Sequence, residues 1–220
     1  TLVPVLMLIF VRGKIVPADA LAYVHLDVDP ESEQFASASL IADRIPLLSR
    51  IAVDAVNGVA GVKVDYAKQI EPWAGGELAL AALPAGLRGE RVLMIEADDT
   101  DGAEKFASEL LGPKQSTATI EGTDVSIGRA GAAWTVSNGF LLIGSREGLE
   151  AMLAADAGTL EGADGTGVLD ELPEDRVAYA FVSAEGARAL FGSRGLEPID
   201  TFIDSAATEG AAASLSADGS

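Results

Sequence analysis

The chain has 220 residues, of which 49% are apolar and 5% aromatic, and its 34 acidic and 15 basic side chains give a net charge of −19. A chain of this size can bury a sizeable core, and its negative field repels the phosphate backbone of nucleic acids, which argues against a nucleic-acid partner. The absence of cysteine excludes disulfides, thiolate nucleophiles and cysteine metal sites.

The chain opens with an almost unbroken apolar run at residues 2–11, followed by Arg12, Gly13 and Lys14. A run of about ten residues is too short for a hydrocarbon core that needs about 20. We interpret residues 1–13 as the end of a truncated membrane-spanning or signal-anchor segment. The alternative is an ordinary buried strand or helix at the start of the domain.

A recurrent unit follows, in which a strand ends in acidic residues and leads into a helix. The first copy runs from Pro17 through Tyr23 into a strand at 24–28, and a second copy starts at Pro173 and contains Tyr179. The two tyrosines differ by a constant offset (179 − 23 = 156) that the two prolines share. We therefore predict an internal repeat.

Phenylalanines mark the helices of the same units. Residues 33–40 and 104–111 share Glu, Phe, Ala, Ser and Leu at one offset (106 − 35 = 71), so Phe106 corresponds to Phe35, and Phe191 corresponds to Phe35 at the larger offset. Each helix is expected to bury its phenylalanine against the sheet. The predicted anchors of the repeat are Tyr23, Phe35, Phe106, Tyr179 and Phe191.

Antiparallel hairpins are predicted between these units. Strands at 77–83 and 91–97 flank a loop rich in proline and glycine, and strands at 132–137 and 140–143 flank Asn138 and Gly139. An Asn-Gly pair favours a type I′ turn, because that turn needs positive φ at both positions.

Two further elements complete the predicted order. Ser145 is the predicted N-cap of a helix through Ala155. Residues 211–217 form a predicted strand of small residues.

The element order predicts an α+β fold, with an antiparallel β-sheet that carries its helices on one face. We divide the chain into a first half-domain at 15–157, a glycine-rich linker at 158–172, and the start of a second, incomplete half-domain at 173–220. The two half-domains are predicted to be related, with the second one truncated.

Acidic residues at the strand exits are candidates for chemistry, with Asp27 in the first unit and Asp98 in the next. Helix capping explains them most simply, because carboxylates stabilise a helix N-terminus. The alternatives are a weak divalent-cation site or an acid–base pair. An EF-hand is excluded: with Gly102 at the sixth loop position, Ala97 and Ser108 would occupy the two positions that need carboxylates. No metal site is predicted.

Other motifs carry little chemistry. His25 is the only histidine and falls within a predicted strand, so we assign it a structural role rather than a place in a catalytic triad. Trp73 precedes two glycines, and we interpret it as a core plug at the sheet edge, or alternatively as a residue that docks a ligand or partner. No phosphate-binding loop or nucleophile elbow is present. No catalytic residue and no cofactor are predicted, and the weak ligand candidates are Trp73, Asp27 and Asp98.

The segments at 17–23, 72–80 (PWAGGELAL) and 140–153 (FLLIGSREGLEAML) resemble a bacterial family described as domain of unknown function (DUF) 3352. The resemblance covers roughly residues 15 to 220. It implies a long extracytoplasmic protein with an N-terminal membrane-spanning segment. It implies no activity and no catalytic residues.

We therefore expect a non-enzymatic binding or interaction module of the bacterial envelope, a single-pass membrane protein with this domain on the extracytoplasmic side. Its expected partner is an unknown protein or an apolar ligand, and it is attached to the membrane by the N-terminal apolar segment. Two alternatives stay open. One is a carboxylate-based hydrolase, with or without a metal, that uses Asp27 with Asp98. The other is a purely structural repeat of an envelope assembly.

Overall fold

The computed structural model describes residues 15–29, 64–84, 90–154, 158–160, 167–173, 176–192 and 210–216. The strands in these ranges are β1 (Ala22–Asp27), β2 (Ala74–Leu83), β3 (Glu90–Ala97), β4 (Ser116–Ile120), β5 (Thr123–Ile127), β6 (Ala132–Ser137), β7 (Phe140–Ser145), β8 (Arg176–Val182) and β9 (Ala211–Ser216). The helices are α3 (Tyr66–Gln69), α4 (Thr100–Leu111), α5 (Arg146–Leu153), α6 (Gly167–Asp170) and α7 (Ala184–Gly192), with a 3-10 turn η1 (Arg129–Gly131).

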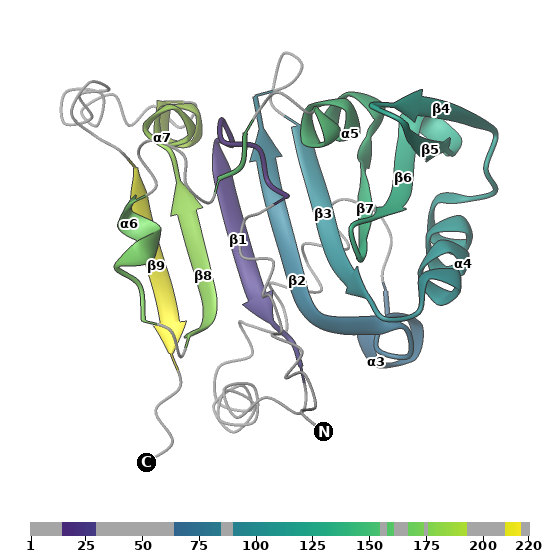
Figure 1. Cartoon of the computed structure of the whole chain (residues 1–220), viewed down its shortest axis with the longest axis horizontal. Helices are drawn as coiled ribbons and strands as arrows, with labels where there is room; N and C mark the ends of the chain where they lie inside the picture. Colours follow the sequence, from purple (N-terminus) through teal and green to yellow (C-terminus); the bar gives the residue numbers. More distant parts are fainter. Residues whose placement is uncertain are drawn as a thin grey trace, which may run out of the picture.

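The strands form one nine-stranded sheet in the order β4-β5-β6-β7-β3-β2-β1-β8-β9 (Figure 1). Each neighbouring pair in this order is antiparallel. The predicted α+β class and antiparallel sheet are therefore confirmed. β8 and β9, which fall in the predicted second half-domain, belong to the same sheet as the first seven strands.

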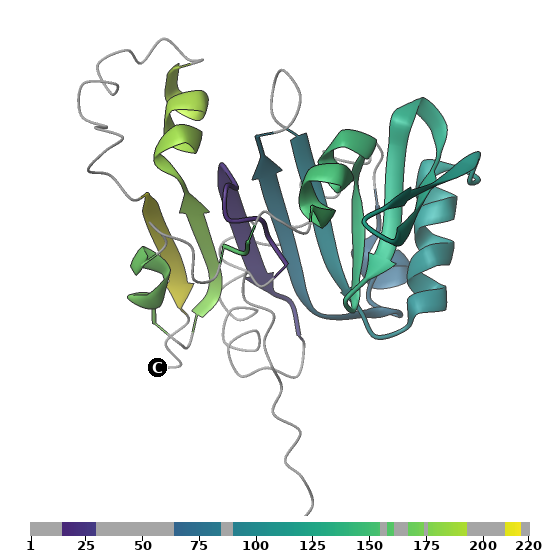
Figure 2. The same cartoon turned by 45° about the horizontal axis from the view of Figure 1, so that its top comes forward.

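Helices cover both faces of the sheet, so the prediction that they lie on one face is wrong. Phe106 of α4 packs with Ile95 of β3 on one face, which we call the α4 face. Leu149 of α5 packs with Met94 of β3 on the opposite face, the α5 face, and Figure 2 shows α5 in front of the sheet. The physical reason is that β3 and β7 are apolar at successive positions, and such strands must be buried on both sides.

Three helices start with the same four-residue pattern, in which a capping residue is followed by any residue, an acid and a glycine. The segments are 99–102, 145–148 and 183–186, with Asp, Ser and Ser as caps. The Ser145 hydroxyl accepts a hydrogen bond from the Gly148 N–H at 2.9 Å, which confirms the predicted cap of α5. The Ser183 hydroxyl accepts one from the Gly186 N–H at 3.0 Å.

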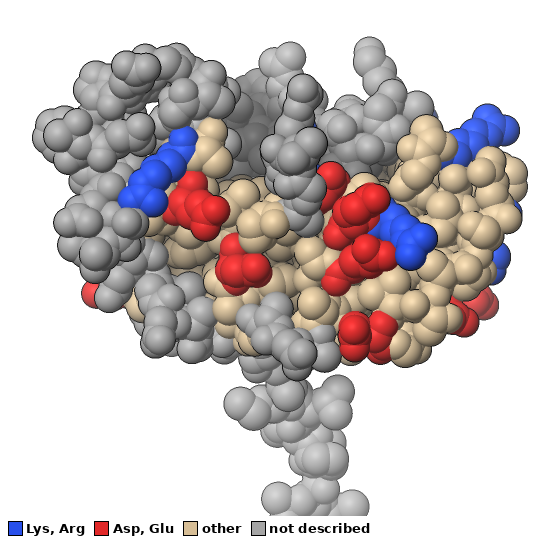
Figure 3. All heavy atoms as spheres, turned by 90° about the horizontal axis from the view of Figure 1, so that it is seen from above, with Lys and Arg blue, Asp and Glu red and all other residues tan. Residues whose placement is uncertain are grey.

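The glycine of this pattern lets the first helical turn lie against a neighbouring segment. A Cβ at Gly186 would lie 1.8 Å from the carbonyl oxygen of Leu21, and a Cβ at Gly102 would lie 2.7 Å from the Cβ of Trp73. Acidic side chains form several separate groups at the end of the molecule where α5 and α7 lie (Figure 3). This placement is consistent with carboxylates that stabilise helix N-termini.

The predicted Asn-Gly hairpin is confirmed. Asn138 has a φ of 52° and Gly139 a φ of 80°, as a type I′ turn requires. A second turn of this kind joins β4 and β5, where Glu121 has a φ of 46° and Gly122 a φ of 79°. The sequence analysis did not locate that hairpin, because glutamate is not one of the residues that favour positive φ.

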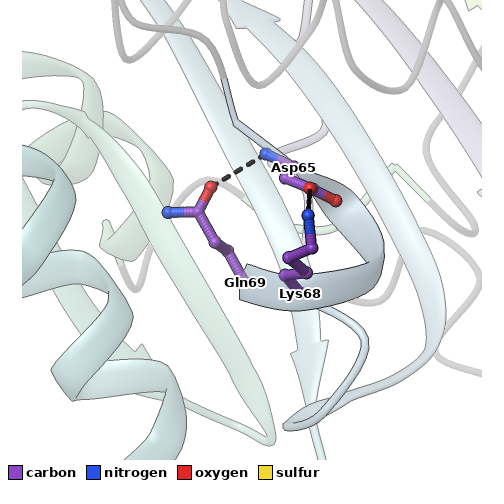
Figure 4. A network of polar contacts seen from close by, with 3 residues as sticks. All are labelled: Asp65, Lys68 and Gln69. Carbon is purple, nitrogen blue, oxygen red and sulfur yellow. Dashed lines mark hydrogen bonds and ion pairs between the residues drawn. The ribbon is translucent and has the colours of Figure 1, made fainter.

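A short polar network fixes the chain before β2 (Figure 4). The Lys68 ammonium lies 2.8 Å from the Asp65 carboxylate, and the side chain of Gln69 accepts a hydrogen bond from the Asp65 N–H at 2.8 Å. The hydrogen bond from Lys68 lowers the pKa of Asp65. The indole N–H of Trp73 donates to the Gln69 carbonyl at 2.6 Å, which ties α3 to the start of β2.

Several predictions on chain organisation remain open. The apolar segment predicted at 1–13 lies outside the described residues, and no helix within the described ranges has the length and hydropathy needed to cross a membrane. In the predicted linker at 158–172, Leu160 is fully buried and its N–H donates to the Val16 carbonyl at 2.7 Å. The division into half-domains stays a prediction.

Candidate functional site

An open pocket of about 350 Å³ lies between the start of the described chain, the β6–β7 turn and the end of α5. Its described lining combines apolar residues with uncharged polar ones, and polar atoms make up slightly more than half of its exposed surface. The lining residues are Ile15, Pro17, Thr123, Ser137, Asn138, Leu142, Met152, Leu153, Ala154, Gly158 and Thr159. None of these described residues is charged, although the chain has 34 acidic and 15 basic residues. A volume above about 300 Å³ suits a small organic ligand.

Local structure explains how this pocket forms. The type I′ turn brings Asn138 to one side, and the helix α5 stops at Leu153, so that Ala154 leaves the helix with extended ψ of 115°. On the other side, Pro17 pairs with Thr159 in an isolated β-bridge. Backbone pairing thus holds the chain on both sides of the pocket.

A second group of polar side chains lies on the α5 face, on strands β1, β2 and β3. We call His25, Glu77 and Glu96 the acceptor cluster. His25 of β1 pairs with Ala79 of β2 on one side and with Tyr179 of β8 on the other. Because side chains alternate along a strand, His25 and Glu77 point to the same side of the sheet.

His25 is the most unusual member of the acceptor cluster. Its side chain is 10% exposed, and its Nε2 lies 3.7 Å from Oε2 of Glu77, whose side chain is also 10% exposed. That separation is too long for a hydrogen bond. Within the described part of the chain, the buried Nε2 has no hydrogen-bond partner. Buried polar atoms nearly always have one, so this atom requires an explanation.

Two tyrosines flank the histidine. The ring of His25 stacks on Tyr179 with centroids 5.0 Å apart, and Tyr23 meets Tyr179 edge-on at 5.7 Å. The guanidinium carbon of Arg176 lies 4.7 Å from the centroid of the Tyr179 ring. Burial, together with the neighbouring Tyr179 and the charge of Glu77, raises the pKa of Tyr23 well above its usual range.

Glu96 is held by an irregularity in β2. The pairing of β2 with β3 shifts between Ala74 and Leu78, and a Cβ at Gly75 would lie 2.6 Å from the Glu96 carboxylate. Burial raises the pKa of Glu96, and the charges of Glu77 and Asp98 raise it further, while hydrogen bonds from the backbone at Gly76 and Glu77 oppose the rise. The absence of a side chain at Gly75 leaves room for this carboxylate.

The structure does not place the two predicted candidates Asp27 and Asp98 on neighbouring strands. Asp27 ends β1, half-buried, opposite Glu77, and its carboxylate accepts a hydrogen bond from the Asp29 N–H at 3.0 Å. Asp98 is exposed after β3, and its N–H donates to the Trp73 carbonyl at 3.0 Å. β2 lies between their strands. Glu77 of β2, directly opposite Asp27, and Glu96 of neighbouring β3 lie between the two candidates, and neither glutamate was predicted as a site residue.

Trp73 is 5% exposed and its ring lies 5.2 Å from that of Phe106, which is 4% exposed. The indole is therefore part of the core on the α4 face, in agreement with its interpretation as a core plug. Among the other predicted anchors, Tyr23 and Tyr179 are also buried. Phe35 and the side chain of Phe191 lie outside the described residues.

Within the described ranges, no group of three or more histidine, aspartate or glutamate side chains is arranged to hold a metal ion.

Comparison with known families gives one match. A family model described as "Protein of unknown function (DUF3352)" matches residues 8–184 of this chain. No curated protein and no solved structure matches it. The matched range includes β1 through β8, and with them the pocket and the acceptor cluster.

Proposed function

This chain belongs to the DUF3352 family, and on that premise we propose that it is a non-enzymatic binding module that holds a small, uncharged, partly apolar ligand in the pocket beside α5. One observation carries the proposal. The chain has a net charge of −19, yet none of the described residues that line this pocket is charged. A ligand there would bury its apolar surface against Leu142 and Met152. The side chains of Ser137 and Asn138 would provide the few hydrogen bonds that orient it.

The proposed location is the outer side of a bacterial membrane, to which the N-terminal apolar segment tethers the protein. The apolar run at 2–11 and the family resemblance support this proposal. The full-length gene product should then sediment with membranes, and protease added to intact spheroplasts should digest this domain. Recovery in the soluble fraction, or protection from protease, would contradict it.

The pocket proposal is tested with an uncharged fluorescent probe such as Nile red. Ala154 lines the pocket and is exposed at the end of α5, so Ala154→Phe should fill the space and weaken probe binding by about tenfold or more. Ala67→Phe, at an exposed position of α3, is the matched control and should bind like the unmodified chain. Equal binding by all three chains would show that the probe does not use this pocket.

A carboxylate-based hydrolase is the second candidate, and one observation favours it. Glu77 and Glu96 lie on neighbouring strands, and burial raises the pKa of Glu96, as a general acid requires. Turnover of nitrophenyl esters or glycosides that disappears in Glu96→Gln would support this candidate. Equal rates in the Glu96→Gln variant and the unmodified chain would dismiss it.

A further inference from the structure

The acceptor cluster concentrates negative charge at a poorly solvated position. Glu77 is 8% exposed, Glu96 is half-buried, and the charge of Glu77 is one cause of the raised pKa of Glu96. In the described part of the chain, neither glutamate forms an ion pair with a lysine or arginine. Like charges on neighbouring strands are destabilising, and buried charges are normally paired. Among the described residues, the two glutamates thus have no lysine or arginine partner.

The unpaired nitrogen of His25 also indicates a positively charged hydrogen-bond donor as the group that binds here. Its side chain is nine-tenths buried, and its Nε2 lies 3.7 Å from the Glu77 carboxylate. In the tautomer that carries its proton on Nδ1, His25 presents Nε2 as an acceptor. That nitrogen and the Glu77 carboxylate are then both within reach of one N–H-bearing group placed about 2.9 Å from each. An ammonium carries three such donors and a guanidinium five, and neither has an acceptor atom that the glutamates would repel.

The flanking tyrosines add to this preference. Aromatic rings attract cations, and the guanidinium of Arg176 already lies over the Tyr179 ring at 4.7 Å. A metal ion is a poorer fit, because the described residues offer no group of three metal ligands. The net charge of −19 also favours encounter with basic proteins over acidic ones.

We propose that the acceptor cluster of His25, Glu77 and Glu96 binds an ammonium or guanidinium group, supplied by a lysine or arginine side chain of a partner protein. Nε2 of His25 and the carboxylate of Glu77 accept the first hydrogen bonds, and the carboxylate of Glu96 balances the charge. This site shares no residue with the pocket beside α5, so the two proposals can be tested independently.

The single histidine makes a direct test available. In a chain without an affinity tag, labelling with ¹⁵N-histidine gives the imidazole signals of His25 alone. We expect a saturable shift of the Nε2 signal on addition of a short arginine peptide or of methylguanidinium. The same peptide with citrulline, and sodium chloride at equal ionic strength, should give no saturable shift. If the salt or the citrulline peptide acts like arginine, the proposal is overturned.

Variants locate the site. Glu77→Gln and Glu96→Gln should each weaken arginine-peptide binding at least about tenfold, because the first removes a charge-assisted hydrogen bond and the second removes the balancing negative charge. Glu109→Gln changes the net charge equally but lies on α4, which covers the opposite face of the sheet, and it should leave binding unchanged. If Glu77→Gln does not fold, the binding affinity of Glu96→Gln alone tests the proposal, because Glu96 is only half-buried.

Unchanged affinity in folded Glu96→Gln overturns the proposal, as does the absence of a saturable shift in the unmodified chain. A response to methylguanidinium without one to the arginine peptide overturns the assignment to a partner side chain and identifies a small organic cation as the source. Loss of Nile red binding in Ala154→Phe bears on the pocket alone, so the two proposals can fail separately.

Discussion

Val24 of β1 lies directly opposite Ala180 of β8 in the antiparallel pairing, and the two residues are also one repeat offset apart (180 − 24 = 156). The pairs on either side are exchanged accordingly, with Tyr23 opposite Phe181 and His25 opposite Tyr179. A half-turn about an axis through the central pair therefore maps each strand onto the other, as in an isologous contact. Every antiparallel pair has such a local axis, so the division into two related half-domains stays a prediction.

Gly186 is predicted to be intolerant of any side chain. A Cβ there would lie 1.8 Å from the Leu21 carbonyl oxygen, so Gly186→Ala must push α7 away from β1. We expect the free energy of unfolding to fall by about 2 kcal/mol, the size of an overpacking defect. Urea denaturation followed by tryptophan fluorescence measures it. In Gly167→Ala, where a Cβ would meet nothing within 4 Å, the change should be small, and a similar loss in both variants would contradict the argument.

The stability should depend on pH through Glu96. Its folded-state pKa is raised from 4.5, mainly by burial, so the folded protein binds this proton more tightly than the unfolded chain. The resulting stabilisation is complete below about pH 4.5 and is lost as the pH rises through the folded-state pKa. Relative to Glu96→Gln, whose amide cannot ionise, the unmodified chain should lose stability over this window. Urea midpoints from about pH 4 to about pH 7 measure the difference, and a constant difference would count against the prediction.

The cap of α5 is expected to be coupled to β3. The Ser145 hydroxyl accepts from the Gly148 N–H and donates to the Glu90 carboxylate at 2.6 Å. Ser145→Ala should cost about 1 kcal/mol. A double-mutant cycle with Glu90→Gln measures the second contact, and we expect a coupling free energy of about 1 kcal/mol. Additive effects of the two substitutions would show that the contact to Glu90 contributes nothing.

Trp73 is predicted to stabilise the fold through both its ring and its N–H. Trp73→Phe keeps an aromatic ring against Phe106 but removes the donor to the Gln69 carbonyl, which should cost about 1 kcal/mol. Trp73→Ala also leaves a cavity and should cost about 3 to 5 kcal/mol. Thermal or urea unfolding measures both. Equal losses in the two variants would mean that the ring packing matters less than the hydrogen bond.

Local signals in the sequence located much of the sheet. Alternation and turn residues placed β1, β2, β3, β6 and β7, and the positive φ of Asn138 and Gly139 is a property of those residue types themselves. The cap at Ser145 was predictable for the same reason, although α5 ends at Leu153 rather than at Ala155.

Long-range relationships were not predictable in this way. The successive apolar residues of β3 indicate that both faces of the sheet are buried. They do not indicate which helix covers which face, so the opposite positions of α4 and α5 were not predicted. Glu77 and Glu96 were missed because they come together only when β2 bulges at Gly75 and Gly76. The usable signal was the pair of glycines before Glu77, since two adjacent glycines in a strand indicate a close backbone approach.

The position of β1 in the middle of the sheet has a consequence during synthesis. β1 ends at Asp27 and its neighbour β8 begins at Arg176. One edge of β1 therefore has no partner strand while about 150 further residues are synthesised. At about 5 to 20 residues per second, this delay is roughly 8 to 30 s. An unpaired edge invites pairing with other nascent chains, so the ribosome-bound chain has to be shielded over that interval.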